Sequence, residues 1–416
     1  MEKLYSDAHT IIKNSIAENL PQKAVQNALK NHTFIGNVYL VAIGKAAWTM
    51  ASAAKKELGD KIKEGIVITK YGHSENPIPD IEIIEAGHPI SDENTILGTR
   101  KAIELTEKLK EGDELLFLIS GGGSALFEKP LEGISLSDLA DINTQLLASG
   151  ADIVEINMIR KRLSSVKAGR FAKLCAPAKV FTIVLSDVLG DRLDSIASGP
   201  AAPDFSTKED AIRVAEKYKL RLNDKVWEYL KEETPKSLDN VKTVITGSVK
   251  TLCQSAAHNA QLLGYTPYIF CDDLNCTARE AGKFISAIAR QIGNGGIESI
   301  KPPCAIIFGG ETVVHLKGNG KGGRNQELAL SAAEGIVQRA NVVIFSVGSD
   351  GTDGPTDAAG GIVDGNTAKL LKEKGLNISD ILDNNDAYHG LSAINALIKT
   401  GPTGTNVNDI AIILYG

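Results

Sequence analysis

Three aspartates stand close together in a glycine-rich segment near the C-terminal end of the chain. The segment reads GSDGTDGPTDAAGG, follows the apolar run VVIF, and contains Asp350, Asp353 and Asp357. Glycine costs about 1 kcal/mol in a helix interior and proline about 3 kcal/mol, so we expect a loop here. Asp-Gly pairs are common in ordinary turns, and the segment alone leaves a turn and a functional site both open. The spacing of the acids does not fit an EF-hand, which argues against a dedicated calcium site.

Two other glycine-rich segments have the composition of anion-binding loops. SGGGSALF (120–127) follows an apolar run and leads toward a helix. HLKGNGKGGRNQELALSAA (315–333) places Lys321 and Arg324 before a helix that we expect to begin near Asn325. Backbone N–H groups, cations and a helix N-terminus favour a phosphate or carboxylate. The alternatives are a tight turn for the first segment and a mobile basic hairpin tip for the second.

Single charged residues follow two further apolar runs. Lys45 comes directly after VAIG, where it is either an anion-binding group or an ordinary surface lysine. SDVLGDRLDSIASGP sets Asp187 and Asp191 beyond IVLS. Such acids can hold Mg²⁺ through one or two carboxylates, or can be solvated loop residues. A nucleotide phosphate with Mg²⁺, and a hydroxyl that needs a base, would account for the acids and the cations together.

These residues are joined by a chain in which short apolar runs alternate with helical patterns. We expect strands at VYLVAIG (38–44), GIVITKYG (65–72), IEIIEAG (81–87), ELLFLIS (114–120), VFTIVLS (180–186), VKTVITG (241–247), TPYIF (266–270), CAIIFGG (304–310), VVIFSVG (342–348) and DIAIILY (409–415). The alternation predicts an α/β protein with mostly parallel sheets covered on both faces. Ligands bind outside the carboxyl ends of strands in such sheets, so the polar loops are expected to converge on one cleft.

Length and composition set the remaining limits. The chain has 416 residues, and the polar stretch KEETPKSLDN predicts a boundary between domains 1–236 and 237–416. A net charge of −6 argues against a nucleic-acid binder. Neither a signal peptide nor a run of about 18 apolar residues is visible, so we expect no membrane association. Five cysteines without a CxxC pair predict reduced thiols and a cytoplasmic location. Seven scattered histidines argue against a histidine-built metal site.

Five long motifs carry a resemblance to a known family. They are SGGGSALF, LSDVLGDRLDSIASGP, GGETVVHLKGNGKGGRNQELAL, GSDGTDGPTDAAGGIVDG and TGPTGTNVND. From Lys45 to Asp409 the chain closely resembles the two-domain glycerate 2-kinases, the glycerate kinase family with a MOFRL C-terminal domain. It departs slightly from that pattern at Ser349, where threonine is frequent, and at Gly361, where alanine is usual.

The resemblance implies a fold and a reaction. The fold would be a three-layer, Rossmann-like N-terminal domain with a mostly parallel sheet and a smaller α/β C-terminal domain, with the active-site cleft between them. The reaction would be transfer of the γ-phosphate of ATP, with Mg²⁺, to the 2-hydroxyl of D-glycerate, giving 2-phosphoglycerate and ADP. Composition alone distinguishes neither the 2- from the 3-hydroxyl nor a monomer from a homodimer.

The resemblance also supports Lys45, Arg324 and Asp350 as cleft residues, and the roles below are our own assignment. We assign Lys45 and Arg324 to stabilising charge on the transferring phosphate or the glycerate carboxylate. Asp350 would orient or deprotonate the accepting hydroxyl, with Asp353 as an alternate, and Asp187 or Asp191 would hold the metal. Substrate and nucleotide contacts are expected at Ser120, Gly121, Gly122, Gly123, Ser124, Glu311, Lys321, Gly322, Gly323, Asn325, Asp353, Thr405 and Asn406.

Two other functions remain as alternatives. A hydroxypyruvate reductase would need an NAD(P)H site, and no predicted strand is followed by GxGxxG and a ribose-binding acid. A non-catalytic sugar-acid-binding protein would explain the anion-binding loops but not the clustered acids.

Overall fold

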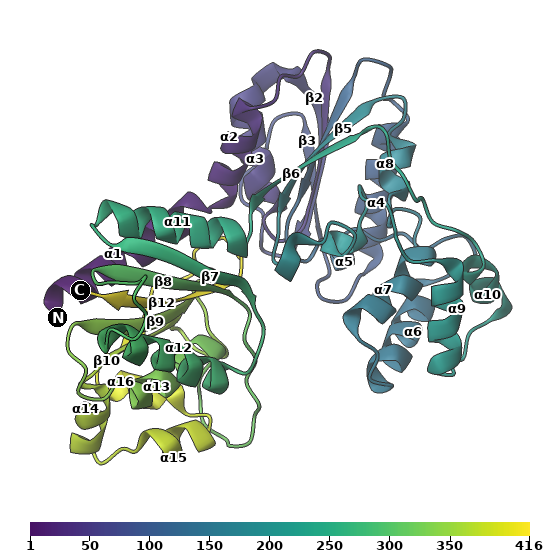
Figure 1. Cartoon of the computed structure of the whole chain (residues 1–416). Coiled ribbons are helices and arrows are strands. Elements are labelled where there is room, and N and C mark those ends of the chain that lie inside the picture. Colours follow the sequence, from purple (N-terminus) through teal and green to yellow (C-terminus); the bar gives the residue numbers. More distant parts are fainter. The chain divides into compact units, whose positions relative to one another are not determined.

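The chain folds into two compact units. The computed structural model describes residues 1–416, except for the side chain of Asp191. The first unit is Pro21–Thr246, and the second unit combines Met1–Leu20 with Gly247–Gly416 (Figure 1). The sequence placed a domain boundary between residues 236 and 237, whereas the chain continues through one more strand of the first sheet before the second unit begins.

The sheet of the first unit has the strand order β3-β2-β1-β4-β5-β6. Its strands are β1 (Val38–Ile43), β2 (Ile62–Lys70), β3 (Ile81–Ala86), β4 (Glu114–Ile119), β5 (Lys179–Leu185) and β6 (Val241–Gly247). The pairs β1–β2, β2–β3, β1–β4 and β4–β5 are parallel, as the uninterrupted apolar runs predicted. The strand order reverses between β1 and β4, and this switch point is where open α/β sheets bind their ligands.

Helices cover both faces of this sheet, and four more form a separate cluster (Figure 1). The sheet carries α2 (Pro21–Lys30), α3 (Ala47–Leu58), α4 (Glu93–Thr106), α5 (Gly123–Leu126) and α8 (Arg170–Leu174), with short 3₁₀ turns η1 (Gly59–Lys61), η2 (Leu189–Asp191) and η3 (Ile196–Ser198). The cluster is α6 (Leu136–Ala148), α7 (Ile153–Arg162), α9 (Lys208–Lys217) and α10 (Asp224–Leu230). It has its own apolar core, which the sequence analysis did not separate from the rest of the domain.

Local sequence explains where several of these helices begin. Asp92, Ser135, Asp152 and Thr207 each accept a hydrogen bond from the third backbone N–H of the helix that follows, and the side chain at that third position bonds back. This capping box satisfies two backbone donors that a helix start otherwise leaves open.

The sheet of the second unit is mixed, with the order β11-β10-β9-β12-β8-β7. Its strands are β7 (Thr266–Leu274), β8 (Cys304–Gly310), β9 (Val342–Gly348), β10 (Gly360–Asp364), β11 (Leu397–Ile398) and β12 (Asp409–Tyr415). Only β7–β8 is parallel among the described pairs, and this differs from the expected mostly parallel sheet. The last strand, β12, enters between β8 and β9 and runs opposite to both. A strand buried on both faces is continuously apolar in either direction, so composition could not reveal this.

The helices of the second unit include one from the far N-terminus. They are α1 (Glu2–Glu18), α11 (Val249–Leu262), α12 (Ala278–Gly293), α13 (Arg324–Gly335), α14 (Thr367–Glu373), α15 (Ile378–Asp383) and α16 (Ala387–Ala393). Asn14 Nδ2 on α1 donates to Asn259 Oδ1 on α11 over 3.0 Å. In the described part of the chain, no helix is long and apolar enough to cross a membrane.

Helix α13 begins at Arg324 without a capping side chain of its own, because its N-cap residue is Gly323. The acceptor comes from the β9–β10 loop instead. Asp353 Oδ1 accepts from Asn325 N over 3.1 Å, and Asp353 Oδ2 accepts from Gln326 N over 2.8 Å. A side chain on Gly323 would meet Asp353 Oδ1 at 2.3 Å, so only glycine allows this approach. The aspartate therefore caps a helix that starts 29 residues earlier in the chain.

Replacing Asp353 should destabilise the fold. Asp353→Ala leaves two buried N–H groups without an acceptor, and we expect a loss of about 2 kcal/mol in the free energy of unfolding. Urea denaturation measures it. Asp357→Ala on the same loop is the control, because Asp357 is exposed and should cost much less. Equal losses for the two variants would contradict the capping role.

The same residue should give stability a pH dependence. Burial raises the pKa of Asp353 to about 7, although the two N–H groups oppose this. Between about pH 4 and pH 7 the folded chain keeps a proton that the unfolded chain has released, so the contribution of this group falls as pH rises through that window. Asp353→Asn cannot ionise. The stability gap between wild type and Asp353→Asn should therefore be wider near pH 5 than near pH 8 in urea denaturation, and a gap that widens with pH would contradict this.

Candidate functional site

The loops after β1 and β4 are tied together at the switch point of the first sheet. Lys45 N donates to Gly121 O over 2.9 Å, and Ala46 N donates to Ser120 Oγ over 3.1 Å. Ser120 Oγ in turn donates to Ile43 O over 3.1 Å. The Ser120 side chain is buried, so its hydroxyl serves to hold the two loops in register. Its role in substrate binding stays a prediction.

Lys45 and His88 flank the glycine loop. A methyl group built on Gly122 would lie 2.9 Å from His88 Nε2 and 3.3 Å from Lys45 Cε, so both side chains pass close to the same point. Gly122 has a φ of +84°, a conformation that favours glycine. Among the described side chains, the Lys45 ammonium forms no ion pair within 4.0 Å. His88 is not among the site residues expected from the sequence, although it too comes directly after a predicted strand.

Asp187 lies against the neighbouring glycine of the same loop, Gly121. A methyl group built on Gly121 would come within 2.4 Å of Asp187 Oδ2. Burial raises the pKa of Asp187, and the charge of Lys45 opposes this rise. The structure thus brings together Lys45, Gly121, Gly122 and Asp187. The side chain of Asp191 lies outside the described residues.

The backbone of Ser124 accepts a hydrogen bond from a lysine that belongs to a buried ion pair. Lys167 Nζ donates to Ser124 O over 2.8 Å and pairs with Glu128, while Ser124 Oγ lies 2.8 Å from Ser198 Oγ. Helix α5 (Gly123–Leu126) has only a single turn, so the helix dipole expected behind SGGGSALF is small. For the predicted anion binding, this leaves individual N–H groups and the cations beside the loop as the contacts.

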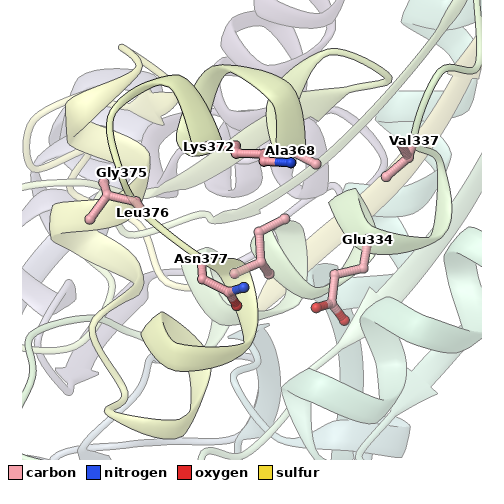
Figure 2. Close-up of a pocket in the computed structure, with 8 residues that line it drawn as sticks. Glu334, Val337, Ala368, Lys372, Gly375, Leu376 and Asn377 are labelled. Atoms are coloured by element: carbon pink, nitrogen blue, oxygen red, sulfur yellow. The ribbon is translucent and has the colours of Figure 1, made fainter.

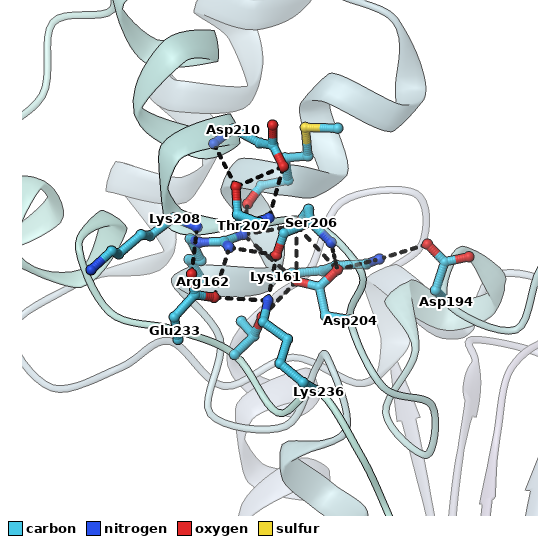
Figure 3. Close-up of polar contacts among 12 residues, drawn as sticks. Lys161, Arg162, Asp194, Asp204, Ser206, Thr207, Lys208, Asp210, Glu233 and Lys236 are labelled. Carbon is cyan, nitrogen blue, oxygen red and sulfur yellow. Dashed lines mark hydrogen bonds and ion pairs between the residues drawn. The ribbon is translucent and has the colours of Figure 1, made fainter.

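The rest of the Asp187–Ser198 loop is anchored to the helical cluster through ion pairs (Figure 3). Lys161 Nζ on α7 contacts Asp194 Oδ2 at 3.2 Å and Asp204 Oδ1 at 3.3 Å. Arg162, which is fully buried, lies 3.6 Å from Asp204 Oδ2. Because Asp194 is engaged in this network, it anchors the loop that carries Asp187.

Arg324 is the centre of the predicted site in the second unit. Its Nε and Nη2 donate to Asp409 at 2.5 and 3.1 Å, and its Nη1 lies 3.0 Å from Glu311 Oε1. Burial raises the pKa of Asp409, while the hydrogen bond and charge of Arg324 oppose this rise. The two-point contact fixes the plane of the guanidinium, whose side chain is still 34 % exposed. Arg324 is therefore both positioned and accessible.

Asp350 lies next to this pair. Its Oδ1 accepts from Thr352 N over 2.9 Å. A methyl group built on Gly348 would lie 3.3 Å from Oδ1 of both Asp350 and Asp409. The half-exposed Asp350 carboxylate is thus close to the acid that orients Arg324, and the structure brings together Glu311, Arg324 and Asp350.

Several other predicted site residues use their side chains for contacts with other parts of the protein. Asn325 is buried and accepts from Ser346 Oγ over 2.6 Å, and Thr405 Oγ1 donates to Asn19 O over 2.9 Å. Asn406 Oδ1 accepts from Asn408 N over 3.2 Å. Lys321 places its Nζ 4.6 Å from the centre of the Tyr388 ring, and its neighbour Gly322 packs against Ala387. Binding roles for these residues, as for Gly323 and Asp353 at the start of α13, stay predictions.

A cavity of about 610 Å³ lies elsewhere in the second unit (Figure 2). It is lined by Glu334 and Val337, by Ala368 and Lys372 of α14, and by the turn Gly375–Ile378. None of the predicted site residues lines it, so its size alone does not mark the site.

Comparisons with known proteins agree with the motifs. Residues 7–231 match the model of a domain of unknown function, DUF4147, and residues 304–409 match the MOFRL family. A curated D-glycerate 2-kinase from Thermotoga maritima is 54 % identical over 99 % of this chain and 98 % of its own length. The crystal structure of a Thermotoga maritima glycerate kinase covers 100 % of both chains with a TM-score of 0.97.

More distant relatives carry two kinds of name. A glycerate 2-kinase from Pyrococcus horikoshii is 43 % identical over 95 % of this chain and 93 % of its own length. An Agrobacterium vitis relative with a provisional hydroxypyruvate reductase name is 37 % identical over 92 % of this chain and 100 % of its own length. On the two family models and the full-length identity, this chain belongs to the family of two-domain glycerate kinases that join a DUF4147 region to a MOFRL region.

Proposed function

We propose that this protein is a D-glycerate 2-kinase, which transfers the γ-phosphate of ATP to the 2-hydroxyl of D-glycerate. The observation that carries this proposal is the 54 % identity to a D-glycerate 2-kinase over nearly the whole of both chains. The products would be 2-phosphoglycerate and ADP.

Phosphoryl transfer needs little covalent chemistry from a protein, so positioned charges have to supply most of the rate. Lys45 at the switch point and Arg324 on α13 would stabilise negative charge on the transferring phosphate or on the glycerate carboxylate. Asp350 would accept the proton of the attacking hydroxyl or orient it.

The residues near Gly121 fit a magnesium ion that is held mainly by the nucleotide. Among the described residues, no group of three His, Cys, Asp or Glu side chains could enclose a metal. Mg²⁺ in kinase sites needs only one or two carboxylates, because substrate phosphates and waters complete its coordination. Asp187 would be the carboxylate here, and the bound ion would neutralise charge on the phosphates.

One observation keeps hydroxypyruvate reduction as a second candidate. The strand order of the first sheet is the order found in dinucleotide-binding domains, and relatives carry a reductase name. The turn after β1, however, reads GKAAWT and lacks the three glycines that let a backbone approach a pyrophosphate. Consumption of NADH with hydroxypyruvate in the absence of ATP would favour the reductase.

The reaction itself can be tested by phosphorus NMR. Wild-type protein with ATP, Mg²⁺ and D-glycerate should give 2-phosphoglycerate, and Asp350→Asn should give on the order of a hundredfold less per unit time. If 3-phosphoglycerate were the sole product, the proposed position of transfer would be wrong. Intact ATP with wild-type protein would contradict the kinase activity.

Loss of the Lys45 charge should affect turnover far more than folding. We expect Lys45→Met to lower kcat/KM for glycerate on the order of 100- to 1,000-fold, because a preorganised charge near the transferring phosphate is removed. Lys56→Met is the control, since Lys56 is exposed on the same helix, α3, that follows Lys45. A fall of only about twofold for Lys45→Met would exclude the proposed role.

The location and assembly of the protein stay predictions. Our expectation of a cytoplasmic protein rests on its cysteines, of which Cys175, Cys253 and Cys304 are buried and all five are free thiols. Size-exclusion chromatography with light scattering would distinguish a monomer from a homodimer.

A further inference from the structure

His88 reaches the glycine loop from the end of β3, the strand at one edge of the sheet. It follows β3, and in the strand order β3-β2-β1-β4 two strands separate β3 from β4. Neighbouring strands lie about 4.8 Å apart, so the chain after β3 has to cross roughly 14 Å for the imidazole to meet Gly122. Residues 87–92, which connect β3 to α4, carry the histidine across this distance, and we call them the crossing segment.

The crossing segment begins in a tight turn and is anchored at its C-terminal end. A methyl group built on Gly87 would lie 2.4 Å from Ile90 O, so the turn closes tightly on a glycine. Ser91 Oγ donates to Ala125 O of α5 over 2.7 Å. Asp92 then caps α4. These contacts fix the backbone on either side of His88 and bring its ring against the loop after β4.

The surroundings of His88 are rich in positive charge. Burial, then Lys45, Lys70 and His73, lower the pKa of His88. His73 Nδ1 lies 3.1 Å from Lys45 O, so this second histidine contacts the backbone of the loop after β1. Neither Lys45 nor His88 forms an ion pair within 4.0 Å with any carboxylate among the described side chains. Asp187 is a carboxylate of the same neighbourhood: it lies against Gly121, and the charge of Lys45 acts to lower its pKa.

Cations and N–H donors that converge without a paired carboxylate have the chemistry of an anion site. We propose that His88 contacts the substrates directly and, together with Lys45 and the backbone at Gly122, binds an anionic oxygen of glycerate or of ATP. This inference rests on the proposed kinase function for the identity of the anion, but the site itself rests on the geometry. A carboxylate and a phosphate both offer anionic acceptor oxygens. Steady-state kinetics distinguishes binding of the glycerate carboxylate from binding of an ATP phosphate.

The test compares His88→Leu and His88→Gln with wild type in steady-state kinetics. Loss of one charge-assisted hydrogen bond should change a kinetic constant on the order of 10- to 100-fold in His88→Leu. A higher KM for glycerate with an unchanged KM for ATP assigns the glycerate carboxylate, and the reverse assigns a phosphate. A fall in kcat alone assigns an oxygen that gains charge only in the transition state. His88→Gln keeps a side-chain N–H donor and should recover part of the loss.

The controls separate this inference from folding and from the proposed function. His9→Leu, at an exposed position of α1, should leave all constants unchanged. Thermal denaturation of each variant shows whether it is folded. Calorimetric titration of wild type and His88→Leu with ATP alone and with D-glycerate alone reports binding even if wild type has no kinase activity. If kcat, both KM values and both affinities of His88→Leu stay within about twofold of wild type, His88 does not contact the substrates.

Discussion

The hydrogen bond from Lys45 N to Gly121 O joins the two loops on which the first unit depends. Parallel strands hold their carboxyl ends at one edge of a sheet, but loops that leave that edge separate unless something connects them. Here the bond between backbone groups and the Ser120 hydroxyl beneath it connect the loops after β1 and β4. Lys45 and His88 then lie close to Gly122 of this fixed backbone, and Asp187 lies against Gly121. The glycines are required because two side chains pass within about 3 Å of where a methyl group would lie.

In the second unit, a buried carboxylate positions a cation. Asp409 is at the first residue of β12, in the middle of the sheet, where an unpaired charge would be costly. Arg324 offsets part of this cost through two hydrogen bonds and is held in one orientation as a result. The helix start that carries Arg324 is itself stabilised by Asp353 from a distant loop. Long-range contacts thus position Arg324 and stabilise the start of the helix that carries it.

Polar residues of one sequence motif perform different tasks in the folded protein. In GSDGTDGPTDAAGG, Asp350 stays half-exposed beside Gly348, Asp353 caps α13, and Asp357 pairs with Lys399 at the surface. All three are aspartates in one glycine-rich loop after a strand, so residue type and local sequence did not reveal that their roles differ. The difference lies in which backbone donors and cations the fold brings to each one.

The sequence by itself determined the strands other than β10 and β11, the glycine-rich loops that follow them and the class of the fold, because these depend on local hydrophobicity and backbone freedom. It also indicated Lys45, Arg324 and Asp187, since charged residues in loops after buried strands lie at the edge where α/β sheets bind their ligands. The tertiary structure alone decided that β12 runs antiparallel between β8 and β9, that α1 packs with the C-terminal part of the chain, and that Thr405 and Asn325 bond to the scaffold. It alone brought His88 to Gly122. Each of these features is a contact between residues far apart in the chain, and no local pattern records which distant partner a polar group will meet.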